Sequence, residues 1–164
     1  MGKYPVEALR MMVQIAKETE SHLDYSAYRE RRISADNRKS ISNAVCFSSV
    51  STANDLEAQA IIAPSISGFT ARLLSKYRPS VRIIGLSPSA SAVRQMQIYW
   101  GVTPFMAKRA ESTDILIASS VDLLKNKGVL KSGDVAVVTA GVVNHENRHE
   151  PAQHTNIMRI VKIL

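Results

Sequence analysis

Short apolar segments alternate with amphipathic ones along most of the chain, and this alternation limits the possible folds more than any other feature of the sequence. The short continuous apolar run at 60–63, within residues 58–63, is typical of strands that are buried on both faces of a sheet. The expected strands cover residues 58–63, 81–86, 101–105, 135–139 and 156–163. The expected helices between them cover residues 70–77, 89–96 and 112–127. Because strands that alternate with helices form a parallel-type sheet with helices on both faces, the chain is predicted to be an α/β domain.

The first part of the chain does not belong to this alternation. Pro5 suits the first turn of a helix, since its missing N–H is not needed there, and apolar residues follow at helical spacing as far as Ala16. Residues 22–39 are polar and charged, so we expect a linker or an exposed connection. A second helix rich in small residues is expected over 40–56.

The composition of the chain limits the classes of molecule that it could bind. The chain has 164 residues and a net charge of +7, which suggests anionic partners such as nucleic acid, an acidic surface or phosphorylated metabolites, or else an ordinary basic surface. Basic residues are scattered and aromatic residues make up only 5%, which argues against nucleic acid. No apolar run approaches the ~18 residues of a membrane span, so no membrane association is expected. Cys46 is the single cysteine and cannot form an internal disulfide; we expect a buried, inert thiol rather than a nucleophile, in a cytoplasmic protein.

Residues 63–70 are the clearest candidate for a binding site. They follow an expected buried strand and open an expected helix, whose first N–H groups and positive dipole end attract anions. Ser65, Ser67 and Thr70 bring three hydroxyls to this end, and Gly68 permits close approach of the backbone, so a phosphate could be held there. The alternative is plain N-capping of the helix by Ser67.

Two other features have simpler explanations. Residues 142–154 contain His145, His149 and His154, and this loop is either a metal site or, as we favour, a solvated basic loop that could contact a phosphorylated ligand. Trp100, next to an expected strand, is interpreted as a core aromatic residue. No paired carboxylates and no nucleophile with a base can be argued, so the sequence predicts binding rather than catalysis.

Several segments together resemble the C-terminal domain of the pyruvate kinases, in order and over essentially the whole chain. The matching segments are 2–8 (GKYPVEA), 60–64 (AIIAP), 67–72 (SGFTAR), 75–79 (SKYRP), 99–102 (YWGV), 130–134 (LKSGD), 139–142 (TAGV) and 155–159 (TNIMR). The resemblance implies a three-layer α/β/α domain with a mixed five-stranded sheet whose last strand is antiparallel. It also implies that residues 1–21 are the last helix of the catalytic barrel, with the hinge, and that 22–164 are the regulatory domain.

By this resemblance, the parent enzyme transfers a phosphoryl group from phosphoenolpyruvate to ADP with Mg²⁺ and K⁺ bound in its barrel. The present chain would hold no cofactor and would be inactive alone. The domain would bind a phosphorylated effector and help to form a homotetramer. The alternative is a stand-alone protein with the same domain that binds a phosphorylated ligand.

The resemblance also implies which residues bind the effector. Its phosphate loop corresponds to residues 65–70, and Gly141, Arg148 and His149 belong to a possible effector loop. The family's loop often carries hydroxyls or a cation where this chain has an apolar side chain, and Leu116 takes the place of an arginine that binds the second phosphate of fructose 1,6-bisphosphate. We therefore expect a monophosphate effector, such as AMP, ribose 5-phosphate or glucose 6-phosphate. The expected phosphate-binding residues are Ser65, Ile66, Ser67, Gly68 and Thr70.

Overall fold

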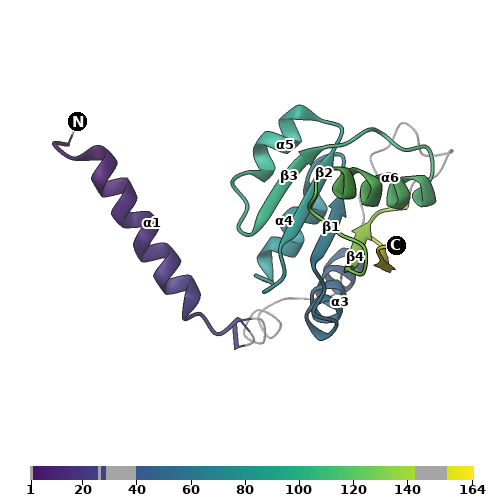
Figure 1. Cartoon of the computed structure of the whole chain (residues 1–164), viewed down its shortest axis with the longest axis horizontal. Helices are drawn as coiled ribbons and strands as arrows, with labels where there is room; N and C mark the ends of the chain where they lie inside the picture. The colour runs from purple at the N-terminus through teal and green to yellow at the C-terminus, as the bar shows by residue number, and fades with distance from the viewer. Residues whose placement is uncertain (1, 26, 29–39, 143–154) are drawn as a thin grey trace.

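The computed structural model describes residues 2–25, 27–28, 40–142 and 155–164, which form an α/β domain preceded by one long helix (Figure 1). The helices are α1 (Pro5–Ser21), α3 (Ile41–Asp55), α4 (Phe69–Lys76), α5 (Ala90–Met96) and α6 (Thr113–Asn126). The strands are β1 (Ala60–Pro64), β2 (Ile83–Ser87), β3 (Val102–Met106), β4 (Val135–Ala140) and β5 (Ile157–Lys162).

The strands form one mixed sheet in the order β3-β2-β1-β4-β5. Strands β1 to β4 pair in parallel, and β5 pairs antiparallel to β4, with Ala140 opposite Ile157 and Val135 opposite Lys162. Strands β1 and β2 are buried at every residue, as their uninterrupted apolar sequences predict. The α/β class and the mixed sheet with an antiparallel last strand are confirmed.

Helices cover both faces of the sheet and create two apolar cores. On one face, Val50 of α3, Leu74 of α4 and Met96 of α5 pack with Ile61 and Val137. On the other face, the buried core is formed by α6 with alternate residues of the same strands. Its members are Ile117, Leu124, Leu130, Ala60, Ile62, Ile84, Leu86, Ala136, Val138 and Ile163. Successive residues of each strand therefore pack into opposite cores. The sheet lies between two layers of helices, as the expected three-layer arrangement requires.

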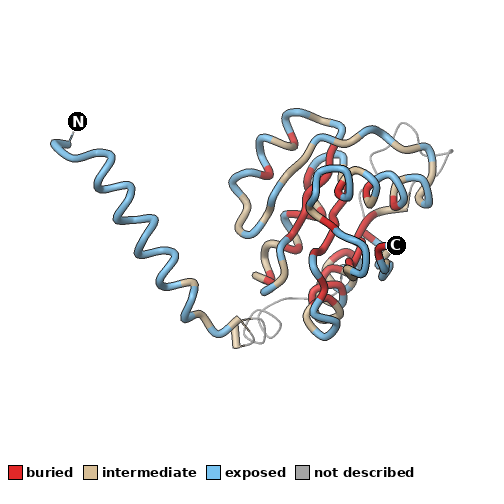
Figure 2. Tube along the Cα trace, viewed as in Figure 1, coloured by how far each residue is buried: buried red, intermediate tan, exposed pale blue. Residues whose placement is uncertain are grey.

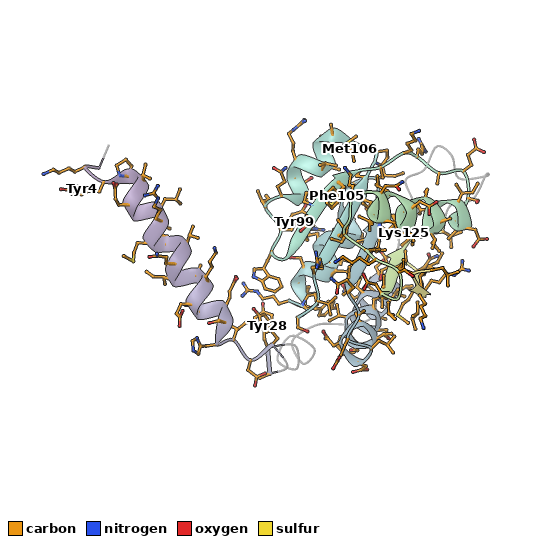
Figure 3. The ribbon with its side chains drawn as sticks, in the orientation of Figure 1. Tyr4, Tyr28, Tyr99, Phe105, Met106 and Lys125 are labelled. Carbon is orange, nitrogen blue, oxygen red and sulfur yellow. The ribbon has the colours of Figure 1, made fainter. Side chains whose placement is uncertain are left out.

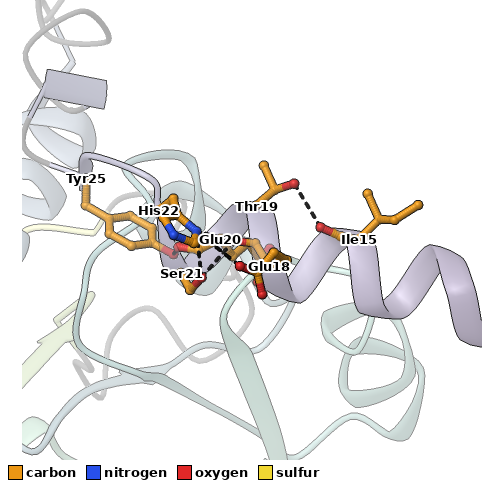
Figure 4. Close-up of polar contacts among 7 residues, drawn as sticks. All are labelled: Ile15, Glu18, Thr19, Glu20, Ser21, His22 and Tyr25. Carbon is orange, nitrogen blue, oxygen red and sulfur yellow. Dashed lines mark hydrogen bonds and ion pairs between the residues drawn. The ribbon is translucent and has the colours of Figure 1, made fainter.

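Helix α1 lies apart from these layers. It continues to Ser21, further than its apolar spacing indicated, and none of its residues is buried (Figure 2). Its last turn is closed by local hydrogen bonds: the Thr19 hydroxyl donates to the Ile15 carbonyl at 2.8 Å, and the Tyr25 hydroxyl donates to the Glu20 carbonyl at 3.1 Å (Figure 4). Within the described residues, no helix has the length and apolar character needed to cross a bilayer.

Candidate functional site

The order of the strands changes direction between β1 and β4. From the carboxyl end of β1 the chain passes through α4 to β2 on one side of this strand pair, whereas after the carboxyl end of β4 the next strand is β5 on the other side. The connections at β1 and β4 therefore lead away from each other, and in open α/β sheets ligands bind outside the carboxyl ends of such a strand pair. Ser65 follows β1 and Gly141 follows β4, so both parts of the expected effector site lie at this edge.

The turn after β1 is fixed to β2 by two hydrogen bonds, and a third joins the end of β2 to the turn that follows it. The amide of Ser65 donates to the carbonyl of Leu86 at 2.8 Å. The buried Ser87 hydroxyl donates to the carbonyl of Ile66 at 2.9 Å and accepts from the amide of Ser89 at 3.1 Å. A single serine at the end of β2 thus joins two neighbouring turns, and the conformation of 65–68 is set by the sheet rather than by a ligand.

Gly68 immediately precedes α4, and two observations explain why glycine occupies this position. Its φ is +77°, in the left-handed region that glycine adopts without strain. A Cβ atom at this position would also come within 2.9 Å of Cγ of Met96, which packs across both Gly68 and Gly85. The close approach of α5 therefore depends on the absence of a side chain.

The amino end of α4 has no side-chain cap, so the structure does not support N-capping by Ser67. Gly68, not Ser67, is the N-cap residue, and the helix begins at Phe69. Within the described chain, the amides of Phe69, Thr70 and Ala71 donate to no backbone carbonyl of the preceding turn, and the first such bond is Arg72 N–H to Gly68 at 3.0 Å. These amides and the positive end of the helix dipole suit an anion, while Ser67 is exposed and Ser65 half-buried.

Thr70 has a different environment from the other two hydroxyl residues. Its side chain is only 4% exposed, and its Oγ1 lies 2.8 Å from Oγ1 of Thr155. Thr155 is 2% exposed, and its amide donates to the Ser42 hydroxyl at 2.9 Å. The Thr70 hydroxyl therefore already has a protein partner in Thr155, unlike the hydroxyls of Ser65 and Ser67 with which the sequence grouped it.

The loop after β4 is closed at its base by one asparagine. The Asn156 amide donates to the Ala140 carbonyl at 3.0 Å, and its side-chain oxygen accepts from the Val142 amide at 3.0 Å. Gly141 is half-buried between these two bonds. The other two residues expected in the effector loop, Arg148 and His149, lie outside the described residues.

The remaining candidates have limited chemistry. Burial raises the pKa of the Cys46 thiol to about 12, which confirms the prediction of an unreactive side chain. In the part of the chain that the structure describes, no His, Cys, Asp and Glu side chains gather in a group that could hold a metal ion. Leu116 is half-buried on the first turns of α6 and offers no charge.

Trp100 corrects the sequence interpretation. It is half-buried rather than part of either core, and its indole N–H donates to the Glu20 carboxylate at 2.7 Å. No pattern in the sequence indicated this contact, because the two residues are far apart in the chain and neither belongs to a periodic pattern.

The fold is a doubly wound α/β/α domain with an antiparallel edge strand. A family profile described as "Pyruvate kinase, alpha/beta domain" matches residues 43–161, and the chain belongs to this family.

Individual relatives agree with this assignment. The chain is 39% identical to a pyruvate kinase of Clostridium acetobutylicum over 141 residues, which are 86% of this chain and 30% of the relative. It is 38% identical to a pyruvate kinase of Staphylococcus aureus over 163 residues, which are 97% of this chain and 26% of the relative. A crystal structure of a pyruvate kinase from Cryptosporidium parvum superposes with a TM-score of 0.81 at 28% identity, covering 99% of this chain and 31% of that one. The chain thus spans less than a third of the length of these relatives.

Proposed function

We propose that this chain is the regulatory part of a pyruvate kinase and binds a phosphorylated effector at the turn 65–70. In the whole protein, a catalytic barrel would transfer the phosphoryl group from phosphoenolpyruvate to ADP. The Mg²⁺ and K⁺ used there would be held by that barrel, because the described residues of this chain offer no grouping suited to a metal. The chain alone is then expected to lack kinase activity, which a coupled assay of pyruvate formation would test.

One observation carries the effector site: the open amino end of α4 lies at the carboxyl ends of β1 and β4, where the strand connections diverge. The first-turn amides, with the hydroxyls of Ser65 and Ser67, supply donors for a phosphate. Gly141, on the neighbouring loop, lies at the same edge. Arg148 and His149 would add positive charge from that loop.

The lack of a cation at position 116 of α6 supports a monophosphate effector. Leu116, half-buried near the start of α6, cannot bind a second phosphate. AMP, ribose 5-phosphate and glucose 6-phosphate each carry one phosphate, for which the turn at 65–70 suffices. Fructose 1,6-bisphosphate would leave its other phosphate without a charged partner at Leu116.

Isothermal titration calorimetry of the chain with each of these four ligands tests the proposal. We expect binding of at least one monophosphate, and Ser67→Asp should abolish it, because a carboxylate at the helix end repels and replaces the phosphate. Ser119→Asp makes the same change of charge on an exposed position of α6 and should leave binding unchanged. Tight binding of fructose 1,6-bisphosphate without binding of monophosphates would contradict the effector class, and no binding of any ligand would contradict the site.

We also propose that residues 1–21 belong structurally to the catalytic barrel and that 22–164 are the regulatory domain. The exposed apolar residues of α1 support this division. They are Val6, Leu9, Met11, Met12, Val13 and Ile15. A helix with so many exposed apolar side chains needs a surface to cover it, and the barrel would provide that surface. The same observation disfavours a stand-alone ligand-binding protein.

Self-association through β5 completes the proposal. Strand β5 is at the edge of the sheet and exposes Met158 and Ile160. An edge strand with free backbone groups and apolar side chains is suited to pair with a second copy. A homo-oligomer built on this edge would leave the carboxyl-end loops of the sheet accessible to an effector.

A further inference from the structure

The segment that follows α1 is attached to the α/β domain through the side chain of Trp100. The indole N–H donates to Glu20 at 2.7 Å, and the Trp100 ring lies 5.8 Å from the ring of Tyr25. The backbone carbonyl of Trp100 accepts a 2.7 Å hydrogen bond from Ser75, in the last turn of α4. Trp100 thus contacts the segment on one side and α4 on the other.

Arg78 adds a second attachment next to the first. Its guanidinium lies 5.3 Å from the centre of the Trp100 ring and 5.1 Å from the centre of the Tyr28 ring. Figure 3 shows Tyr28 between α1 and the α/β domain. Arg78, Trp100 and Tyr28 are all half-buried, and a cation held between two partly desolvated aromatic rings interacts more strongly than one in open solvent.

The backbone of Arg78 is in an unfavourable conformation for an arginine. Its φ is +42°, directly after Tyr77, the C-cap of α4, where glycine is the usual residue. In the described part of the chain, Glu57 is the other non-glycine residue with positive φ, at +47°, and it stands in the equivalent position after α3. Glu57 is exposed, whereas the Arg78 side chain is placed by this same backbone between two rings.

We propose that Arg78 and Trp100 form a clamp that holds Glu20, Tyr25 and Tyr28 against the α/β domain and so sets the direction in which α1 leaves it. We call Glu20, Tyr25, Tyr28, Arg78 and Trp100 the hinge clamp. None of the residues of α1 is buried, so the orientation of its apolar side chains depends on these contacts beyond its end. The strained backbone of Arg78 is retained because glycine there could not supply the guanidinium. The clamp does not depend on the effector site, so an experiment can disprove one of the two proposals and leave the other unaffected.

Trp100 is the only tryptophan in the chain, so its fluorescence reports the clamp directly. We expect Arg78→Gly to shift the emission to longer wavelength and to strengthen quenching by acrylamide. A cation–π contact of ordinary strength favours the closed form about twofold to thirtyfold, and its loss should raise the open fraction accordingly. The matched control is Glu57→Gly, which relieves the same backbone strain away from the clamp and should raise Tm without changing the fluorescence.

Two further variants separate the clamp from a general loss of structure. Glu20→Ala removes the acceptor of the indole N–H and should reproduce the spectral change, whereas Glu20→Gln keeps an acceptor and should restore most of the native signal. Glu18→Ala, an exposed neighbour whose carboxylate lies near His22, should have no effect. Should Arg78→Gly fail to fold, as judged by circular dichroism, Arg78→Lys tests the same ring contacts.

The orientation of α1 can be measured with the same fluorophore. An acceptor dye on Met11→Cys would receive energy from Trp100, and Cys46 is buried and should not react. We expect one narrow distance distribution in the parent chain and a broad one after Arg78→Gly. Emission, quenching and distances that stay the same in Arg78→Gly and Glu20→Ala would overturn the clamp, as would an equal change in Glu57→Gly.

Discussion

Gly68 is required by both its backbone conformation and its neighbour. Gly68→Ala would place a methyl group in left-handed backbone and against Met96, and we expect a loss of about 1–3 kcal/mol in the free energy of unfolding. Gly128→Ala is the matched control, since Gly128 has a φ of +67° and no atom within 4 Å of an added Cβ. Urea denaturation measures both. Equal losses would show that contact with Met96 does not matter.

Thr155 connects α3, α4 and the base of the loop that follows β4. Its hydroxyl contributes to the free energy of unfolding through the hydrogen bond with Thr70. Thr155→Val leaves the buried Thr70 hydroxyl without its partner, which should cost about 1–3 kcal/mol, while Thr155→Ser should retain most of the stability. Thr139 provides the contrast, because its buried hydroxyl has no partner among the described residues. Thr139→Val should therefore be neutral or stabilising in thermal unfolding. A large loss in Thr139→Val would disprove this reasoning.

Cys46 makes stability depend on pH in the alkaline range. Burial raises the thiol pKa from its ordinary value of 9.0 to about 12, so the folded state keeps a proton that the unfolded chain releases. A raised pKa gives a contribution that is complete below pH 9 and is lost between pH 9 and about 12, by at most about 1.4 kcal/mol per pH unit. Urea unfolding of the parent chain and of Cys46→Ala at several pH values measures this. Parallel curves above pH 9 would contradict the burial of the thiol.

Among the elements, β3 and β5 are the strands at the two edges of the sheet, and the proposed association uses β5. Ile160 is 50% exposed there, and Ile160→Lys should weaken self-association without loss of Tm, because charge on an edge strand opposes pairing with another edge. Ile98, between α5 and β3, is 80% exposed, so Ile98→Lys changes the charge and polarity equally but away from β5. Sedimentation velocity distinguishes the two variants. An unchanged mass for Ile160→Lys would place the association surface elsewhere.

The helices and strands also show which structural features a sequence pattern can predict. Buried strands such as β1 and β2 follow from uninterrupted apolar runs, and helices from apolar spacing, because each pattern reports which faces are covered. The antiparallel direction of β5 was expected only from the family resemblance, since residue spacing is the same in either direction. The start of α4 was expected at Thr70 and lies at Phe69, because Gly68 supplies the left-handed turn.

For the whole molecule, the contacts that the sequence could not predict are long-range and polar. The bond between Thr70 and Thr155 joins small residues that follow no period, and the sequence placed Thr70 with Ser65 and Ser67 instead. The ring contacts of Arg78 with Trp100 and Tyr28 depend on a single strained backbone angle. Local pattern therefore predicted the strands, the helices and their layers, whereas the partners of individual side chains required the folded chain.

The reversal of direction at β5 has a practical consequence for experiments. Strand β5 starts beside Ala140, at the carboxyl ends of the parallel strands, and finishes beside Val135, at their opposite ends. Leu164 therefore emerges from the side of the domain remote from Ser65 and Gly141, and it is almost fully exposed. A dye, affinity tag or surface anchor joined to Leu164 would leave the route to those two residues open, so immobilised protein should be suitable for screening small anions.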